Sequence, residues 1–140
     1  MTKSKTTRIR LRTRSIAAAA VLALGAGAAV PAIASASGAA PTQVTITPEN
    51  DGFFGLVSSP QLKQCAKDRK VLILKQLGST QNPRTDQRVL KTAADDRQGN
   101  AYMWDTGNSG HMKGKFYAHV NRTASCKSAS SPSVRMLPNN

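Results

Sequence analysis

The sequence predicts an all-β protein, an antiparallel sandwich of about seven strands preceded by a helical signal peptide. After residue 36, short stretches rich in Val, Ile, Leu and aromatic residues alternate with stretches rich in Gly, Asn, Asp, Ser and Pro. Short apolar stretches bounded by turn residues indicate strands. Their number and spacing are typical of a sandwich. The expected strands are 43–47, 53–57, 69–77, 87–94, 101–104, 115–120 and 133–137.

The first half of the domain contains the clearest strand patterns. Residues 43–47, Gln-Val-Thr-Ile-Thr, alternate polar and apolar side chains, which is the period of a half-buried strand. Asn50-Asp-Gly52 is a turn signal before the next strand. The most apolar segment is 69–77, so we expect it at the centre of a sheet. A loop over 78–86 follows it.

The second half includes one ambiguous segment. The Leu, Lys and Ala content of 87–94 is compatible with a short helix, whereas its flanks favour a strand. Asp95-Asp-Arg-Gln-Gly99 predicts a turn, and the Gly-rich stretch 107–114 predicts a flexible, exposed loop. The strand 133–137 is expected to close the sheet.

The N-terminus has the three parts of a cleavable signal peptide. A leader without acidic residues carries six positive charges, at Lys3, Lys5, Arg8, Arg10, Arg12 and Arg14. An Ala-rich apolar run over 16–33 follows, and Ala34-Ser35-Ala36 predicts cleavage between Ala36 and Ser37. A permanent membrane anchor is the alternative, but the run is weakly apolar and contains Pro31. The expected organisation is a signal peptide (1–36), a flexible lead (37–42), the sandwich domain (43–137) and a short tail (138–140).

The net charge of +13 falls once the leader is removed, because 14 Lys and Arg then face 7 Asp and Glu, a net charge of +7. The densest group is Lys67, Arg69 and Lys70. Such a charge favours polyanions such as cell-wall polymers, although many exported proteins carry it as ordinary solvated surface. No run of aromatic residues is interleaved with the positive charges, so we expect no nucleic-acid partner.

The two cysteines, Cys65 and Cys126, predict a disulfide, because an exported chain meets an oxidising compartment. If consecutive strands run antiparallel, both cysteines come to the same end of the sheet, where a bridge is possible. Free thiols and metal ligands are the competing interpretations. The cysteines and the two histidines, His111 and His119, lack the paired spacing of zinc sites, so we expect no metal and no cofactor.

Several segments resemble a known family when taken together. Phe54-Gly-Leu-Val57, Arg69-Lys-Val-Leu-Ile-Leu74, Asp95-Asp-Arg-Gln-Gly99 and Gly114-Lys-Phe-Tyr-Ala-His-Val120 resemble, in order and spacing, the carboxypeptidase regulatory-like or transthyretin-like (immunoglobulin-like) β-sandwich. Small secreted bacterial proteins with similarly placed cysteines are the more specific likeness. The chain departs from the family pattern at Asp95, where Thr is usual, and at Tyr102, where the aromatic residue comes one position late.

This resemblance implies a fold and no catalytic residue. It also marks a turn motif, in which Gly99 adopts a positive φ and Asp96 accepts hydrogen bonds from turn amides. The late aromatic residue leaves open which face of the 101–104 strand is buried.

The residues that invite a chemical role have ordinary structural interpretations. Phe116, Ala118 and Val120 share one face of their strand and are expected in the core, which places His119 on the solvent side. His111 lies in a loop, and the pair Asp95-Asp96 is expected to cap amides. Other expected core residues, Trp104 and Tyr102, would form a sugar- or peptide-binding surface only if exposed. We therefore do not expect an enzyme.

The sequence leaves three hypotheses for function. The first is a secreted, non-enzymatic binding or structural module at or outside the cell envelope, with an extracellular protein or an anionic cell-wall polymer as partner and no stable membrane anchor. The second is a secreted protease inhibitor that presents the loop 78–86 or 107–114. The third is a polyanion binder that depends on the net charge of +7.

Overall fold

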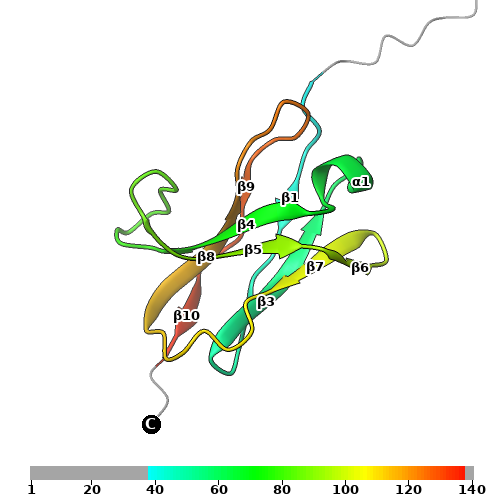
Figure 1. The fold of residues 1–140 in the computed structure, drawn as a ribbon. Coiled ribbons are helices and arrows are strands. Elements are labelled where there is room, and N and C mark those ends of the chain that lie inside the picture. The colour runs from blue at the N-terminus through cyan, green and yellow to red at the C-terminus, as the bar shows by residue number, and fades with distance from the viewer. Residues whose placement is uncertain (1–37, 138–140) are drawn as a thin grey trace, which may run out of the picture. The chain divides into compact units, whose positions relative to one another are not determined.

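The computed structural model describes residues 38–137 and shows two antiparallel five-stranded sheets packed against each other (Figure 1). The β3–β7 sheet has the order β1 (Gln43–Val44), β3 (Gly52–Ser58), β7 (Ala101–Asp105) and β6 (Asp96–Gln98), and β2 (Thr47–Glu49) also pairs with β3. The β4–β8 sheet has the order β10 (Val134–Met136), β8 (Gly114–Val120), β4 (Arg69–Lys75) and β5 (Gln87–Ala94), and β9 (Ala129–Ser130) also pairs with β8. A short helix, α1 (Leu62–Cys65), connects β3 to β4. The predicted all-β fold with antiparallel sheets is confirmed.

Side chains from both sheets fill one core. Phe53 on β3 packs against Phe116 on β8 with ring centroids 5.3 Å apart, which joins the two layers. Val71 and Ile73 from β4 are fully buried in the same cluster. The most apolar segment of the sequence is thus a central strand, as predicted, because β4 has a neighbour on each side.

The predicted strand 43–47 is interrupted and extends further than expected. β1 and β2 pair with β3 in one continuous register, from Gln43 opposite Ser58 to Glu49 opposite Gly52. Between them, Leu56 N–H donates to the Thr45 side-chain hydroxyl at 2.9 Å instead of to a backbone carbonyl. The predicted turn at Asn50-Asp-Gly52 closes this hairpin, with Asn50 at φ 45°.

Residues 87–94 form a strand, β5, so the interpretation favoured by their flanks is confirmed. The pairing of β4 with β5 contains a bulge, because Ile73 lies opposite Leu90 and Leu74 opposite Arg88, which leaves Val89 as an extra residue. Val89 and Leu90 both pack against the core as a result.

The predicted turn over 95–99 is wrong for Asp96–Gln98, which form β6 and pair with β7. The chain reverses at Gly99 and Asn100, where Gly99 adopts φ 58°, the positive φ expected for this residue. The Asp96 carboxylate accepts a hydrogen bond from Gln98 Nε2 at 2.9 Å in place of the expected turn amides. With β2, β6 and β9, the described part has ten strand segments where the sequence predicts about seven.

The predicted flexible lead over 37–42 is also wrong from Ala40 onward. Ala40 forms a parallel bridge with Cys126, and its N–H donates to Ser125 O at 2.7 Å. Ala40 and Thr42 are both buried. The signal peptide, the cleavage site at Ala36 and Ser37, and the tail 138–140 lie outside the described residues. Within residues 38–137, no helix has the length and apolar character needed to cross a membrane.

Candidate functional site

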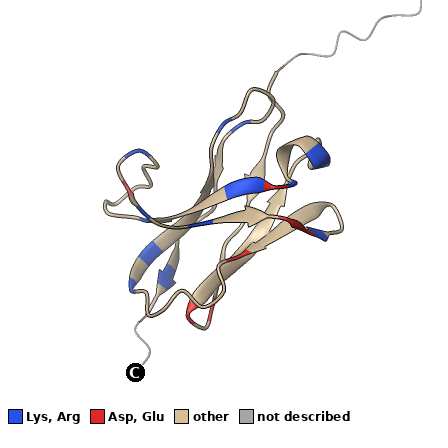
Figure 2. Cartoon of the chain, viewed as in Figure 1, with Lys and Arg blue, Asp and Glu red and all other residues tan. Residues whose placement is uncertain are grey.

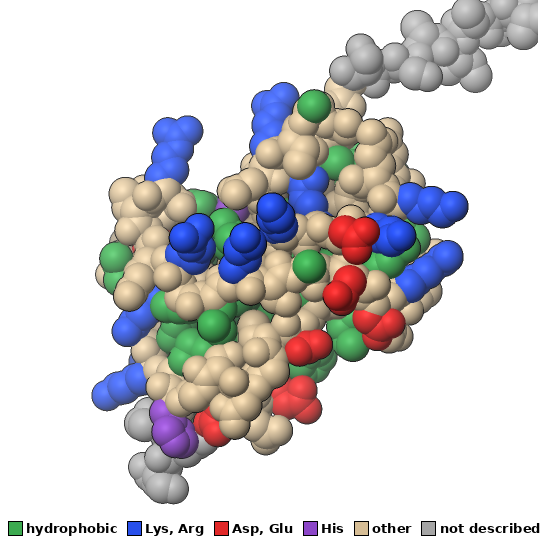
Figure 3. All heavy atoms as spheres, in the orientation of Figure 1, with side chains coloured by type: hydrophobic (Ala, Val, Ile, Leu, Met, Phe, Trp, Pro, Cys, Tyr) green, Lys and Arg blue, Asp and Glu red, His purple; other side chains and the backbone are tan. Residues whose placement is uncertain are grey.

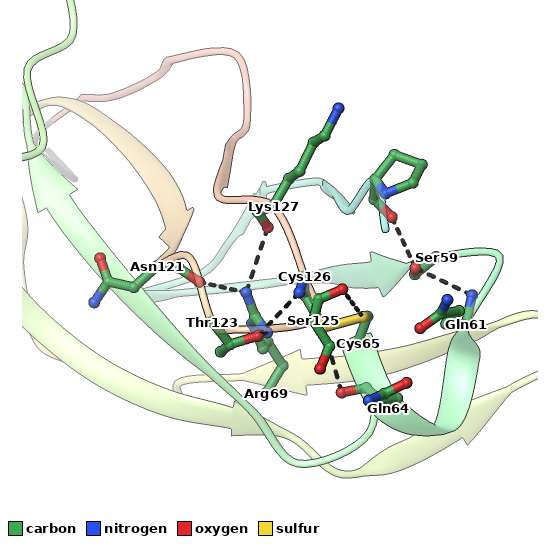
Figure 4. Close-up of a disulfide and its surroundings, with 11 residues drawn as sticks. Ser59, Gln61, Gln64, Cys65, Arg69, Asn121, Thr123, Ser125, Cys126 and Lys127 are labelled. Carbon is green, nitrogen blue, oxygen red and sulfur yellow. Dashed lines mark hydrogen bonds between the residues drawn. A yellow bond between two sulfur atoms is a disulfide. The ribbon is translucent and has the colours of Figure 1, made fainter. Parts of the chain in front are cut away.

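Cys65 and Cys126 form the predicted disulfide, with their Cα atoms 5.6 Å apart (Figure 4). Cys65 ends α1, and Cys126 lies in the connection from β8 to β9, so the bond joins two segments that are distant in sequence. Both residues are buried, and the described part contains no free cysteine. A thiol nucleophile at Cys65 is therefore excluded in the oxidised protein.

Arg69 lies beside this disulfide and holds the same loop (Figure 4). Its guanidinium donates to the carbonyl oxygens of Asn121 and Lys127 and to Thr123 Oγ1. The side chain is only 7% exposed, and this burial lowers the pKa of Arg69. Arg69 therefore acts as a structural clamp, and it drops out of the basic group Lys67, Arg69 and Lys70 as a surface charge.

The prediction that His119 faces solvent is wrong, because this residue is only 8% exposed. Tyr117, on the same side of β8, is fully buried. Tyr117 bonds to the loop that follows β4, which we call the strap (residues 76–86), and His119 lies opposite Ser130 of the neighbouring strand β9. The alternation of the strand is as predicted, but the outward-facing Tyr117 and His119 are buried as well.

Asp86 is the residue that fastens the strap. Its carboxylate accepts hydrogen bonds from Leu77 N–H at 3.0 Å, Asn82 N–H at 2.7 Å and Tyr117 O–H at 2.7 Å. Burial raises the pKa of Asp86, but these three donors outweigh burial and leave the pKa below its ordinary value. Burial and the bond to Asp86 raise the pKa of Tyr117.

His119 and Ser130 make the one contact that resembles a catalytic pair in the described residues, with Nδ1 and Oγ 2.8 Å apart. Burial lowers the pKa of His119, and a hydrogen bond with the Asn121 side chain raises it in part. The group that orients the imidazole is thus a neutral amide. The neighbouring amide of Ser131 already donates to Ala118 O, so it is not free to stabilise an oxyanion.

The other candidate residues do not converge on one site. His111 is 79% exposed, and its Nδ1 lies 3.4 Å from Asp51 Oδ1. Asp95 is exposed, at the junction of β5 and β6. Within residues 38–137, no three His, Cys, Asp or Glu side chains are grouped in a way that would hold a metal ion.

Trp104 and Tyr102 belong to the core, so the sugar-binding surface that would require their exposure is excluded. Trp104 is 1% exposed, and both residues lie in the central cluster. Gly55 explains how the Trp104 ring fits. A Cβ on Gly55 would lie 2.7 Å from Trp104 Cζ2 and 2.1 Å from Thr45 O, so only glycine is compatible with this packing.

The two sheets differ in charge (Figure 2). The strands of the β4–β8 sheet contain seven Lys and Arg and no Asp or Glu, whereas those of the β3–β7 sheet contain three acids and one Arg. Figure 3 shows the acidic side chains gathered in one band across the molecule, with basic side chains on both sides of it. The net charge of the protein is therefore unevenly distributed.

Five of these bases form what we call the basic face, the outer surface of the β4–β8 sheet. Val71 and Ile73 on β4 point into the core, so Lys70, Leu72 and Leu74, which alternate with them, point outward. Residues opposite each other on neighbouring strands share a face. On this basis five exposed bases share the basic face. Lys70, Arg88 and Lys91 lie on β4 and β5, opposite Ala93, Leu74 and Leu72. Lys115 and Arg135 lie on β8 and β10, opposite each other.

The outer surface of the β3–β7 sheet has the opposite character. A shallow hollow of about 650 Å³ lies there, lined by Phe54 and Met103 together with the carboxylates of Glu49, Asp51 and Asp105. Leu56 on the same surface is 38% exposed. Apolar and acidic side chains are therefore mixed on this face.

No protein-family model matches the chain, and no curated protein matches it.

Proposed function

We propose that this protein is an exported, non-enzymatic binding module that holds an anionic polymer outside the cell on its basic face. The observation that carries this proposal is the charge of the basic face, where five exposed bases lie on strands that contain no acid. Export is supported by the N-terminal leader in the sequence and by the disulfide, a bond that persists in oxidising compartments. The transthyretin-like or immunoglobulin-like β-sandwich is the fold family that we propose for it.

The physical basis is electrostatic. Exposed cations on one side of a small domain attract a polymer of opposite charge and release its counterions on contact. The five cations of the basic face are paired in register with neutral residues or with each other, so no acid on these strands competes with an incoming anion. Binding of this kind weakens steeply as the salt concentration rises.

The test uses the protein expressed with its leader and recovered outside the cell, where its intact mass also reports cleavage after Ala36. We expect it to bind long-chain polyphosphate and polygalacturonate and not to bind neutral dextran. The variant Arg88→Glu/Lys91→Glu should weaken binding by about tenfold or more, because it reverses two charges on the face. The matched control is Lys63→Glu/Lys67→Glu, which makes the same change in net charge at exposed positions in and just after α1.

Two results would overturn the proposal: equal losses in the two variants, or binding that does not depend on salt. Catalytic turnover that disappears in a His119→Ala or Ser130→Ala variant would contradict the non-enzymatic assignment. A secreted protease inhibitor stays a hypothesis, and the contacts within residues 38–137 do not specifically favour it.

A further inference from the structure

One pair of residues on the basic face is unusual because two like charges lie directly opposite each other. Lys115 on β8 is the register partner of Arg135 on β10, and both side chains are exposed. The pairs on either side hold this register, with Phe116 opposite Val134 and Met136 opposite Gly114. Phe116 and Met136 are buried in the core, so β10 cannot shift to separate the two charges without losing that packing.

Like charges at directly opposite positions destabilise a sheet, so the pair costs the free protein stability. No acidic residue of the β4–β8 sheet strands lies opposite either cation. The next residue beside Lys115 on the β4 side is Gln76, whose N–H donates to Lys115 O, and Ser133 donates to Gln76 Oε1.

We propose that Lys115 and Arg135 form a phosphate subsite within the basic face, an inference that depends on the proposed binding of an anionic polymer. Successive phosphates of a polyphosphate chain are joined through single bridging oxygens, so two neighbouring phosphates can accept the two-pronged donor of Arg135 and the ammonium of Lys115 at the same time. Successive carboxylates of a polyuronate are separated by a sugar ring, so one carboxylate with one charge leaves more of the repulsion between the two cations in place. The ligand expected here therefore carries phosphate, in contrast to a polymer of uronic acids.

The test compares two polymers and two neutralising variants. Lys115→Gln should weaken binding of polyphosphate by about fivefold, because one of two charged donors is lost, and weaken binding of polygalacturonate clearly less. The matched variant Lys91→Gln removes one exposed charge from another part of the basic face, and it should weaken both polymers to the same extent. Arg135→Lys keeps the charge but removes the planar donor pair, so it should also reduce the preference for polyphosphate.

A second measurement separates this role from a structural one. If the pair is retained for binding at the expense of stability, then Lys115→Gln should raise the melting temperature of the free protein by a few degrees, because repulsion is relieved. Lys91→Gln, whose register partner is Leu72, should leave the melting temperature unchanged. Added polyphosphate should stabilise the natural protein more than the Lys115→Gln variant.

The outcomes distinguish the subsite from the function on which it depends. If the natural protein binds both polymers but Lys115→Gln weakens them equally, or lowers the melting temperature, the phosphate subsite is wrong and the basic face is retained. If the natural protein binds neither polymer, the proposed function fails and the subsite fails with it.

Discussion

The two sheets of this sandwich are built alike on the inside and differently on the outside. On the β4–β8 sheet, the strap bonds to Tyr117 and β9 extends the sheet beside His119, and both of these outward-facing residues are buried. On the β3–β7 sheet, Leu56 is partly exposed beside an open, acidic hollow. The β4–β8 sheet also carries nearly all of the strand-borne positive charge.

The two sheets also differ in the contacts that hold them in place. The β4–β8 sheet is fastened at one end by the disulfide and the Arg69 clamp, and over β8 by the strap through Asp86. Such fastening would hold the backbone that carries the exposed cations in place, which would reduce the entropy lost in the proposed binding. The β3–β7 sheet depends instead on close packing around Gly55.

Removal of the disulfide should have the largest effect on this comparison. A Cys65→Ala/Cys126→Ala variant should lose about 4 kcal/mol of unfolding free energy, because the bond closes a loop with a sequence separation of 61. Urea unfolding measures the loss. In hydrogen exchange, amides of α1 and of the loop after β8 should lose more protection than the drop in global unfolding free energy accounts for. Amides at the β2–β3 turn should show no such extra loss. A loss below about 1 kcal/mol would show that non-covalent contacts alone fasten this end.

Gly55→Ala tests the other sheet. A Cβ at this position would meet Thr45 O at 2.1 Å and the Trp104 ring at 2.7 Å, so the variant should lose about 2–3 kcal/mol. The control is Gly78→Ala in the strap, where the nearest atom to a new Cβ is Thr80 O at 3.8 Å. Thermal unfolding of both variants is the measurement. If the control is destabilised as much as Gly55→Ala, close packing does not distinguish the β3–β7 sheet.

The sequence predicts seven strands because each of these is short, apolar on at least one face and bounded by turn residues, whereas β2 and β6 are exposed and lack this pattern. It predicts the Cys65–Cys126 bond from the oxidising compartment and from antiparallel strands that place both residues at one end. The burial of His119 could not be predicted from alternation, because alternation shows which side of β8 a residue faces and not which other segments, such as the strap and β9, lie next to it.

The basic face illustrates the same limit. Arg88 and Lys91 are three positions apart, so strict alternation would place them on opposite faces of β5. The bulge at Val89 brings both to the outer face, opposite Leu74 and Leu72. A bulge depends on how two strands pair, and a single strand's pattern does not reveal it. The five bases can therefore be assigned to one face only when the register of the sheet is known.

The prediction with the smallest expected effect tests whether the burial of His119 affects stability. Burial lowers the pKa of His119, so its neutral form is favoured in the folded protein. As the pH falls below about 6.5, the ordinary value for histidine, the unfolded chain takes up a proton that the folded protein takes up only at lower pH. Stability should therefore fall with acidification, beginning near this value.

Urea unfolding between pH 5 and 7.5 measures this slope above the range in which carboxylates such as Asp86 titrate. His119→Gln should flatten the slope, and His111→Gln, at a position where the side chain is 79% exposed, should leave it in place. The effect should be smaller than that of Gly55→Ala, because only one proton is involved. If the slope persists in His119→Gln, protonation of the buried His119 imidazole does not cause it. The burial of His119 would then not contribute to a difference in stability between the two sheets.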